Sequence, residues 1–66
     1  MKLTVNGELR DVEGPMTVLG LVESFGLKPQ KIAVERNLEI VPRSAYGEVA
    51  LAEGDRIEIV NFVGGG

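Results

Sequence analysis

The sequence contains no cysteine and no histidine among its 66 residues. Without cysteine, the chain has no disulfide framework, no zinc–thiolate site and no catalytic thiol. Without histidine, it lacks the commonest general base and the other common zinc ligand. We therefore expect neither a metal site nor the chemistry of a self-sufficient enzyme. Four acidic residues of the second half do not have the spacing of a calcium-binding loop, so we expect them to form a solvent-exposed acidic edge. They are Glu48, Glu53, Asp55 and Glu58.

The chain is also poor in aromatic residues and in positive charge. It has no tryptophan, one tyrosine and two phenylalanines, and seven basic against ten acidic residues give a net charge of −3. A nucleic-acid-binding domain needs a basic stripe and aromatic platforms for the bases. No apolar run approaches the roughly 18 residues of a membrane span, and no leader sequence precedes the first expected strand. We therefore expect no nucleic-acid partner, no membrane partner and a cytoplasmic location.

The first half of the chain predicts a hairpin followed by one helix. Residues 2–6 alternate between apolar and polar, and Asn6-Gly7 is a strong hairpin signal because both residues tolerate positive φ. Residues 8–13 form the return strand. Thr17 is a suitable N-cap, and Gly26 stands where a left-handed C-cap residue belongs. The residues of the apolar helix face recur at helical spacing and belong in the core: Val18, Leu21, Val22 and Phe25.

The second half predicts three further strands. Residues 31–37 alternate, a turn follows near Asn37-Leu38, and residues 39–41 form a short strand. The clearest strand is 56–62, in which Ile57 and Ile59 face one side and Glu58 faces the other. A right-handed crossover places the helix on one face of the sheet. With the first and last strands parallel at the centre, the predicted fold is α+β: a β-grasp, a mixed sheet packed on one helix.

The chain ends in "NFVGGG", an apolar strand that runs directly into three glycines. Glycine loses more backbone freedom on folding than any other residue, so a terminal run of it resists being ordered. Such a run is either dispensable or handled by another protein. We divide the chain into a β-grasp domain, residues 1–63, and a flexible glycine tail, residues 64–66.

At this point the sequence resembles the ThiS family, the ubiquitin-like sulfur carriers of bacterial thiamine (thiazole) biosynthesis. The resemblance covers essentially the whole chain and includes "VERNLEIVPRS" and "GDRIEIVNFVGGG". It implies a ubiquitin-like β-grasp that acts as a carrier rather than a catalyst. Its most specific parts are the following segments: Glu35-Arg36-Asn37, Ile40-Val41-Pro42-Arg43, Gly54-Asp55 and the terminal Gly65-Gly66.

The resemblance also implies the chemistry of the tail. The carboxylate of Gly66 would be adenylated with ATP by an E1-like activating enzyme and converted to a thiocarboxylate. A sulfur-donor enzyme such as a cysteine desulfurase would supply the sulfur, and thiazole synthase would receive it. Gly64 and Gly65 would let the tail thread into narrow channels, because glycine has no Cβ. ATP is then used by the activating partner, and the carrier itself holds no cofactor.

Ordering the tail costs binding free energy, so the folded body must contribute a docking surface. If Ile57 and Ile59 point at the helix, Val60 and Phe62 point away from it. An exposed aromatic residue beside a reactive tail is typical of a partner contact, although ordinary packing at a strand end is the alternative for Phe62. We predict that the docking residues are Val60, Phe62 and Val63, with Arg36 and Arg43 as charges at the rim.

Three other functions stay open at this stage. Sulfur carriers of molybdopterin synthesis share the fold and tail, but the short length and the "EIVPRS" turn favour thiazole formation. A ubiquitin-like protein modifier would use the same adenylated terminus. A stand-alone β-grasp module that binds a small ligand or RNA is disfavoured by the acidic balance and the few aromatic residues. Deletion of Gly66 separates these classes, because only a binding module would tolerate it.

Overall fold

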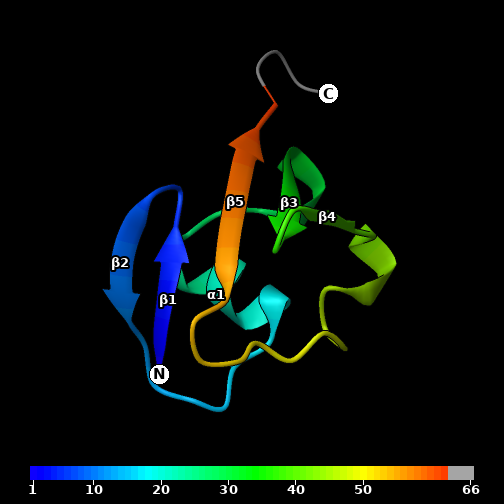
Figure 1. The fold of residues 1–66 in the computed structure, drawn as a ribbon. Coiled ribbons are helices and arrows are strands. Elements are labelled where there is room, and N and C mark those ends of the chain that lie inside the picture. Colours follow the sequence, from blue (N-terminus) through cyan, green and yellow to red (C-terminus); the bar gives the residue numbers. More distant parts are fainter. Residues whose placement is uncertain (63–66) are drawn as a thin grey trace.

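A computed structural model of the protein describes residues 1–62 of the chain (Figure 1). Strands and helices follow each other in the predicted order, and two short 3₁₀ turns, η1 and η2, separate some of them. The elements are β1 (Lys2–Val5), β2 (Glu8–Asp11), α1 (Val18–Ser24), η1 (Pro29–Lys31), β3 (Ile32–Arg36), β4 (Glu39–Val41), η2 (Arg43–Ala45) and β5 (Arg56–Asn61).

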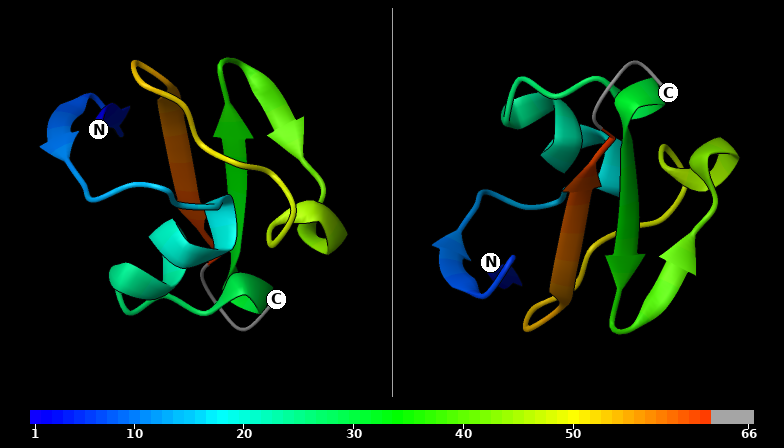
Figure 2. Two further views of the ribbon diagram at one scale, coloured as in Figure 1. Left: turned by 90° about the horizontal axis from the view of Figure 1, so that it is seen from below. Right: turned by 90° about the horizontal axis from the view of Figure 1, so that it is seen from above.

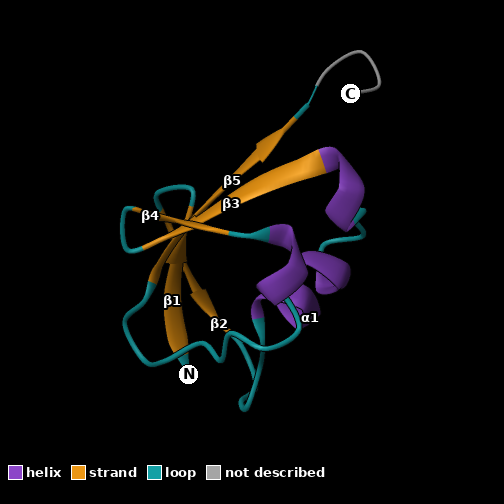
Figure 3. Cartoon of the chain, turned by 90° about the vertical axis from the view of Figure 1, so that its right-hand side faces the viewer, coloured by secondary structure: helices purple, strands orange, loops and turns teal. Residues whose placement is uncertain are grey.

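The five strands form one mixed sheet in the order β2-β1-β5-β3-β4. β1 and β5 are parallel neighbours, while the β1–β2, β3–β4 and β3–β5 pairs are antiparallel. The predicted central, parallel pairing of the first and last strands is therefore confirmed. Figures 2 and 3 show α1 lying across one face of this sheet, which is the β-grasp arrangement. We call the opposite face of the sheet the open face.

The helix forms as the sequence predicts. The Oγ1 atom of Thr17 accepts a hydrogen bond from the backbone N–H of Gly20 at 3.1 Å, so Thr17 is the N-cap. Gly26 has a φ of +74°, in the left-handed region that ends helices. The apolar face of α1 packs on the sheet, with Phe25 only half-buried at its end. The buried core comprises Leu3, Val5, Val18, Leu21, Val22, Ile32, Val34, Val41, Tyr46, Leu51 and Ile57.

Two tight turns join two of the antiparallel strand pairs, β1–β2 and β3–β4. Asn6 and Gly7 connect β1 to β2 with φ values of 50° and 82°, and Asn37 and Leu38 connect β3 to β4 with φ values of 53° and 71°. Positive φ at both central residues is what a type I′ turn requires, and this turn matches the twist of the flanking strands. The two turns have the same geometry, but the second has leucine where the first has glycine.

In residues 1–62, no helix combines the length and the apolar character that crossing a membrane would take.

Candidate docking site at the end of the central strand

The strand that leads to the C-terminal glycines alternates between core and surface. In β5, Ile57 is buried and Ile59 is partly buried, whereas Glu58 and Val60 are exposed. Ile59 pairs with the buried Val34 of β3, which places it on the helix side of the sheet. Val60 therefore lies on the open face, as the sequence predicts.

Phe62 is the last described residue, and its backbone is part of the fold. Its N–H donates a hydrogen bond to the carbonyl oxygen of Lys31 at 2.9 Å, which attaches the end of β5 to the beginning of β3. The side chains of Val60 and Phe62 are 59% and 45% exposed. The two thus form an exposed apolar pair where the tail begins. The other predicted tail and docking residues lie outside the described residues: Val63, Gly64, Gly65 and Gly66.

Arg43 lies at the same end of the sheet as Phe62. Its Nε atom donates a hydrogen bond to the carbonyl oxygen of Pro29 at 3.0 Å, which connects η2 to η1. Pro29 opens η1, the turn that leads through Lys31 into β3. The exposed Arg43 is therefore placed at the end of the sheet where Phe62 bonds to Lys31, and its contact with a partner stays a prediction.

Arg36, the other predicted rim charge, is placed elsewhere. It pairs with the buried Ile57 across β3 and β5, so its side chain points to the helix side of the sheet. There its Nε atom lies 2.8 Å from Oδ2 of Asp55, and only 32% of the side chain is exposed. The structure therefore does not bring Arg36 together with Val60 and Phe62, and its docking role also stays a prediction.

Asp55 is a buried carboxylate that receives three hydrogen bonds. The donors are Nε of Arg36, Nδ2 of Asn37 at 3.0 Å and the N–H of Ala52 at 2.8 Å. Burial alone raises the pKa of Asp55, but the hydrogen bonds from Asn37, Ala52 and Arg36 and the charge of Arg36 outweigh it and lower the pKa. Asn37 also accepts a bond from the N–H of Arg56, so the network joins the β3–β4 turn to β5.

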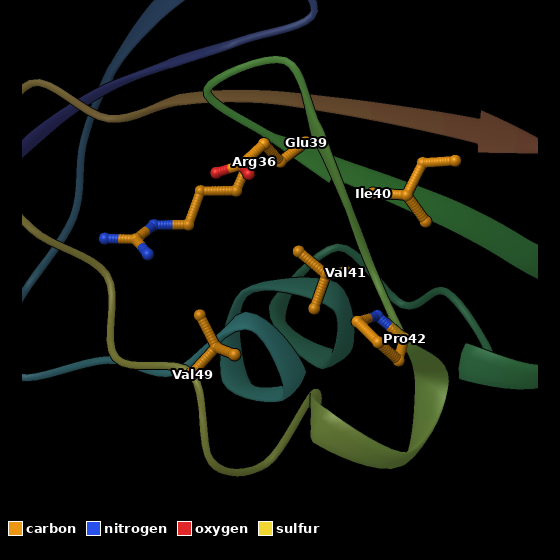
Figure 4. A pocket seen from close by; sticks show the side chains of 6 residues that line it. All are labelled: Arg36, Glu39, Ile40, Val41, Pro42 and Val49. Atoms are coloured by element: carbon orange, nitrogen blue, oxygen red, sulfur yellow. The ribbon is translucent and has the colours of Figure 1, made fainter.

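One shallow pocket of about 190 Å³ lies beside the edge strand β4 (Figure 4). Its only guanidinium belongs to Arg36, which already pairs with Asp55. Within residues 1–62, no three acidic, histidine or cysteine side chains are grouped so that they could hold a metal ion. The pocket therefore offers no constellation for catalysis. It is lined by Arg36, Glu39, Ile40, Val41, Pro42 and Val49.

Sequence reasoning did not single out two features of the β3–β4 hairpin and its surroundings. Leu38 and Ile40 are 82% and 75% exposed, and Glu35 lies directly opposite Glu58 on the neighbouring strand. The exposure of Ile40 was predictable, because it alternates with the buried Val41. The Glu35–Glu58 pairing was not, because it depends on the register between two strands far apart in the sequence.

Comparison with known proteins identifies the family. The model of the ThiS family matches residues 3–66. A crystal structure of the thiamine biosynthesis protein ThiS from Geobacter metallireducens superposes with a TM-score of 0.84 at 33% sequence identity, covering all of both chains. Sulfur carrier protein ThiS of Bacillus subtilis is 48% identical over 50 residues, 76% of each chain.

The chain also resembles part of some longer proteins. It is 54% identical over its full length to a thiazole synthase of Paramagnetospirillum magneticum and 48% identical to one of Magnetococcus marinus. In both comparisons the match covers 20% of the thiazole synthase. The chain thus spans a fifth of the length of these relatives.

Proposed function

This chain belongs to the ThiS family, and we propose that it is a sulfur carrier of thiamine biosynthesis, a protein co-substrate rather than an enzyme. The observation that carries this proposal is the match to the family over residues 3–66, which includes the terminal glycines. The fold that precedes those glycines supports it, because the body is hydrogen-bonded up to Phe62 and presents an exposed apolar pair beside them.

The proposed chemistry takes place at the carboxylate of Gly66. A terminal carboxyl group has a pKa of about 3.3–3.7, so at neutral pH it is an anion that resists nucleophilic attack. In the first step, a carboxylate oxygen attacks the α-phosphorus of ATP and pyrophosphate leaves. In the second, the terminal sulfur of a persulfide on the donor enzyme attacks the acyl carbon, so that AMP leaves and an acyl disulfide forms. A thiol, acting as the two-electron reductant, then attacks the donor-enzyme sulfur, forms a disulfide with it and releases the carrier's sulfur. The product is a thiocarboxylate, a far better nucleophile toward the thiazole precursor.

Three partners follow from this chemistry. An E1-like adenylating enzyme uses the ATP, a sulfur donor such as a cysteine desulfurase supplies the sulfur, and thiazole synthase receives it. The full-length similarity to a fifth of two thiazole synthases supports the last of these and favours thiamine over molybdopterin synthesis. Because the activating step consumes ATP, we place the carrier in the cytoplasm.

Each predicted site residue has a role in this proposal except Arg36, which pairs with Asp55. Gly64 and Gly65 thread through the partner channels, and Gly66 is modified. Val60, Phe62 and Val63 contact the adenylating enzyme around the channel entrance. Arg43, at the same end of the sheet as Phe62, supplies a charge at the rim.

The test is intact mass spectrometry of the carrier purified from cells that also express the adenylating and sulfur-donor enzymes. We expect a mass gain equal to the replacement of one oxygen by sulfur, localised to Gly66 by fragmentation. The matched control is the carrier without Gly66, which should keep its unmodified mass. An unmodified terminus beside an active adenylating enzyme would contradict the proposal and favour a protein modifier or a binding module.

A further inference from the structure

The β3–β4 turn holds a leucine where its geometry favours glycine. Gly7 and Leu38 occupy the same position of two equivalent turns, with φ values of 82° and 71°. A bulky side chain in this left-handed region is a backbone outlier, and such strain is found mostly where function requires it. The leucine side chain is 82% exposed and gains little from burial within the domain. Glycine at position 38 would therefore make the isolated domain more stable than leucine does.

The open face next to this turn carries a second feature that lowers the stability of the isolated domain. Glu35 and Glu58 are exposed and stand directly opposite each other on β3 and β5. Like charges in directly opposite positions destabilise a sheet. Among residues 1–62, neither glutamate takes part in an ion pair, although Arg56 stands two residues before Glu58.

These two features belong to one surface. Ile40 pairs with Glu35 across β3 and β4, so its exposed side chain lies on the open face beside the acidic pair. Leu38 is two residues before Ile40, at the tip of the same hairpin. We call this area the hairpin surface, and it comprises Glu35, Leu38, Ile40 and Glu58.

We propose that the hairpin surface docks the carrier on thiazole synthase, which presents an apolar pocket bordered by arginine or lysine side chains. This inference rests on the sulfur-carrier function proposed above. Burial of the Leu38 side chain in such a pocket would offset the free-energy cost of its strained backbone conformation. A guanidinium placed between Glu35 and Glu58 would convert their repulsion into charge-assisted hydrogen bonds.

The choice of thiazole synthase follows from the relatives. In two thiazole synthases, a segment similar to all of this chain is part of the same polypeptide. Covalent linkage gives two surfaces a high effective concentration for each other. In these relatives the surface of the carrier-like segment is thus held within reach of the synthase portion, which makes thiazole synthase the partner favoured for a docking surface on the body. The net charge of −3 agrees with a basic surface on the partner.

The position of the hairpin surface separates it from the residues around the tail. β3 and β5 are antiparallel, so the β3–β4 turn and Phe62 lie at opposite ends of the sheet (Figure 3). The six residue-to-residue steps from Ile32 to Leu38 span about 20 Å of extended chain. Thiazole synthase can therefore hold the body at the hairpin and still leave the tail end open for entry into its active site.

The test compares two properties of the same variants: thermal unfolding of the free carrier and affinity for purified thiazole synthase. For Leu38→Gly, we expect a Tm no lower than that of the wild type and binding about tenfold weaker. For Glu58→Gln, we expect an equal or higher Tm, weaker binding and a smaller loss of affinity with added salt. The controls are Leu9→Thr, an exposed leucine on the far edge strand β2, and Glu13→Gln. Both should bind as the wild type does.

Three results would overturn the inference: wild-type affinity of Leu38→Gly for the synthase, a loss confined to the adenylating enzyme, or a loss explained by self-association of the carrier. The inference and the carrier function can fail separately. If wild-type carrier delivers sulfur while Leu38→Gly binds normally, only the hairpin surface is wrong. If the wild type never forms a thiocarboxylate, the proposed function is wrong. The binding measurement then still tests whether the hairpin surface docks on thiazole synthase.

Discussion

The N–H of Phe62 donates a hydrogen bond to the carbonyl oxygen of Lys31 at 2.9 Å. This contact attaches Phe62, two positions before the glycine tail, to Lys31, the residue before β3 and 31 positions earlier in the chain. The side chain of Phe62 is not needed for it, because the backbone makes the bond. Side-chain substitutions at Phe62 therefore separate partner contact from the integrity of the fold.

Phe62→Ala should weaken binding to the adenylating enzyme about tenfold or more, because exposed aromatic residues dominate many interfaces. The unfolding midpoint should change little, because nearly half of this side chain is exposed and the backbone bond to Lys31 remains. Isothermal titration calorimetry and thermal unfolding measure the two effects. Phe62→Leu keeps an apolar side chain and should restore most of the affinity. Wild-type affinity of Phe62→Ala would mean that Phe62 only packs at the end of the strand and does not contact the partner.

Deletion of Gly66 should abolish thiocarboxylate formation and leave the stability of the domain unchanged. The reason is that, within residues 1–62, the buried core extends from Leu3 to Ile57 and involves no residue near the C-terminus. Mass spectrometry after incubation with ATP and the activating and donor enzymes measures the first effect, and urea unfolding measures the second. A carrier that still gains sulfur after the deletion would show that the modified group is elsewhere.

Asp55→Asn should destabilise the domain by about 1–3 kcal/mol at pH 7, because a buried hydrogen-bonded carboxylate is lost beside Arg36. The folded state lowers the pKa of Asp55 below its usual value of 3.8. The ionised carboxylate therefore stabilises the fold above pH 4, and this contribution is lost as the pH falls through the lowered pKa. Urea unfolding at several pH values should show the difference between wild type and variant shrinking in acid. A difference independent of pH would contradict the assignment.

Thr17→Ala should cost about 1 kcal/mol, because the side chain of Thr17 caps α1 through the N–H of Gly20. In a domain of this size, that loss corresponds to a Tm lower by about 4–8 °C. Differential scanning calorimetry measures it. Thr17→Ser retains the accepting oxygen and should stay close to the wild type. Equal losses for the two variants would mean that the methyl group, and not the hydrogen bond, is what matters.

Local patterns in the sequence predicted most of the fold. The helix, its N-cap at Thr17 and the alternation of β5 follow from spacings of two to four residues, which a sequence displays directly. The parallel pairing of β1 and β5 was predicted by placing the first and last strands, which were expected to be the longest, side by side at the centre of the sheet.

The sequence did not predict contacts that depend on register between distant strands. Arg36 was expected at a docking rim, but 19 positions separate it from Asp55, its ion-pair partner. The opposition of Glu35 and Glu58 became visible only when β3 and β5 were aligned. The strain at Leu38 was hidden for a different reason, because a leucine in a turn gives no sign in the sequence of its φ angle.

The most direct test of the carrier function is a single turnover with labelled sulfur. Carrier loaded with sulfur-34 at Gly66 would be mixed with thiazole synthase and its other substrates in the absence of ATP, the donor enzyme and free sulfide. The account predicts that the label appears in the thiazole product, in a molar amount equal to the loaded carrier, while the carrier returns to a carboxylate terminus. Thiazole formed without the label, or a label that stays on the carrier while thiazole accumulates, would contradict it.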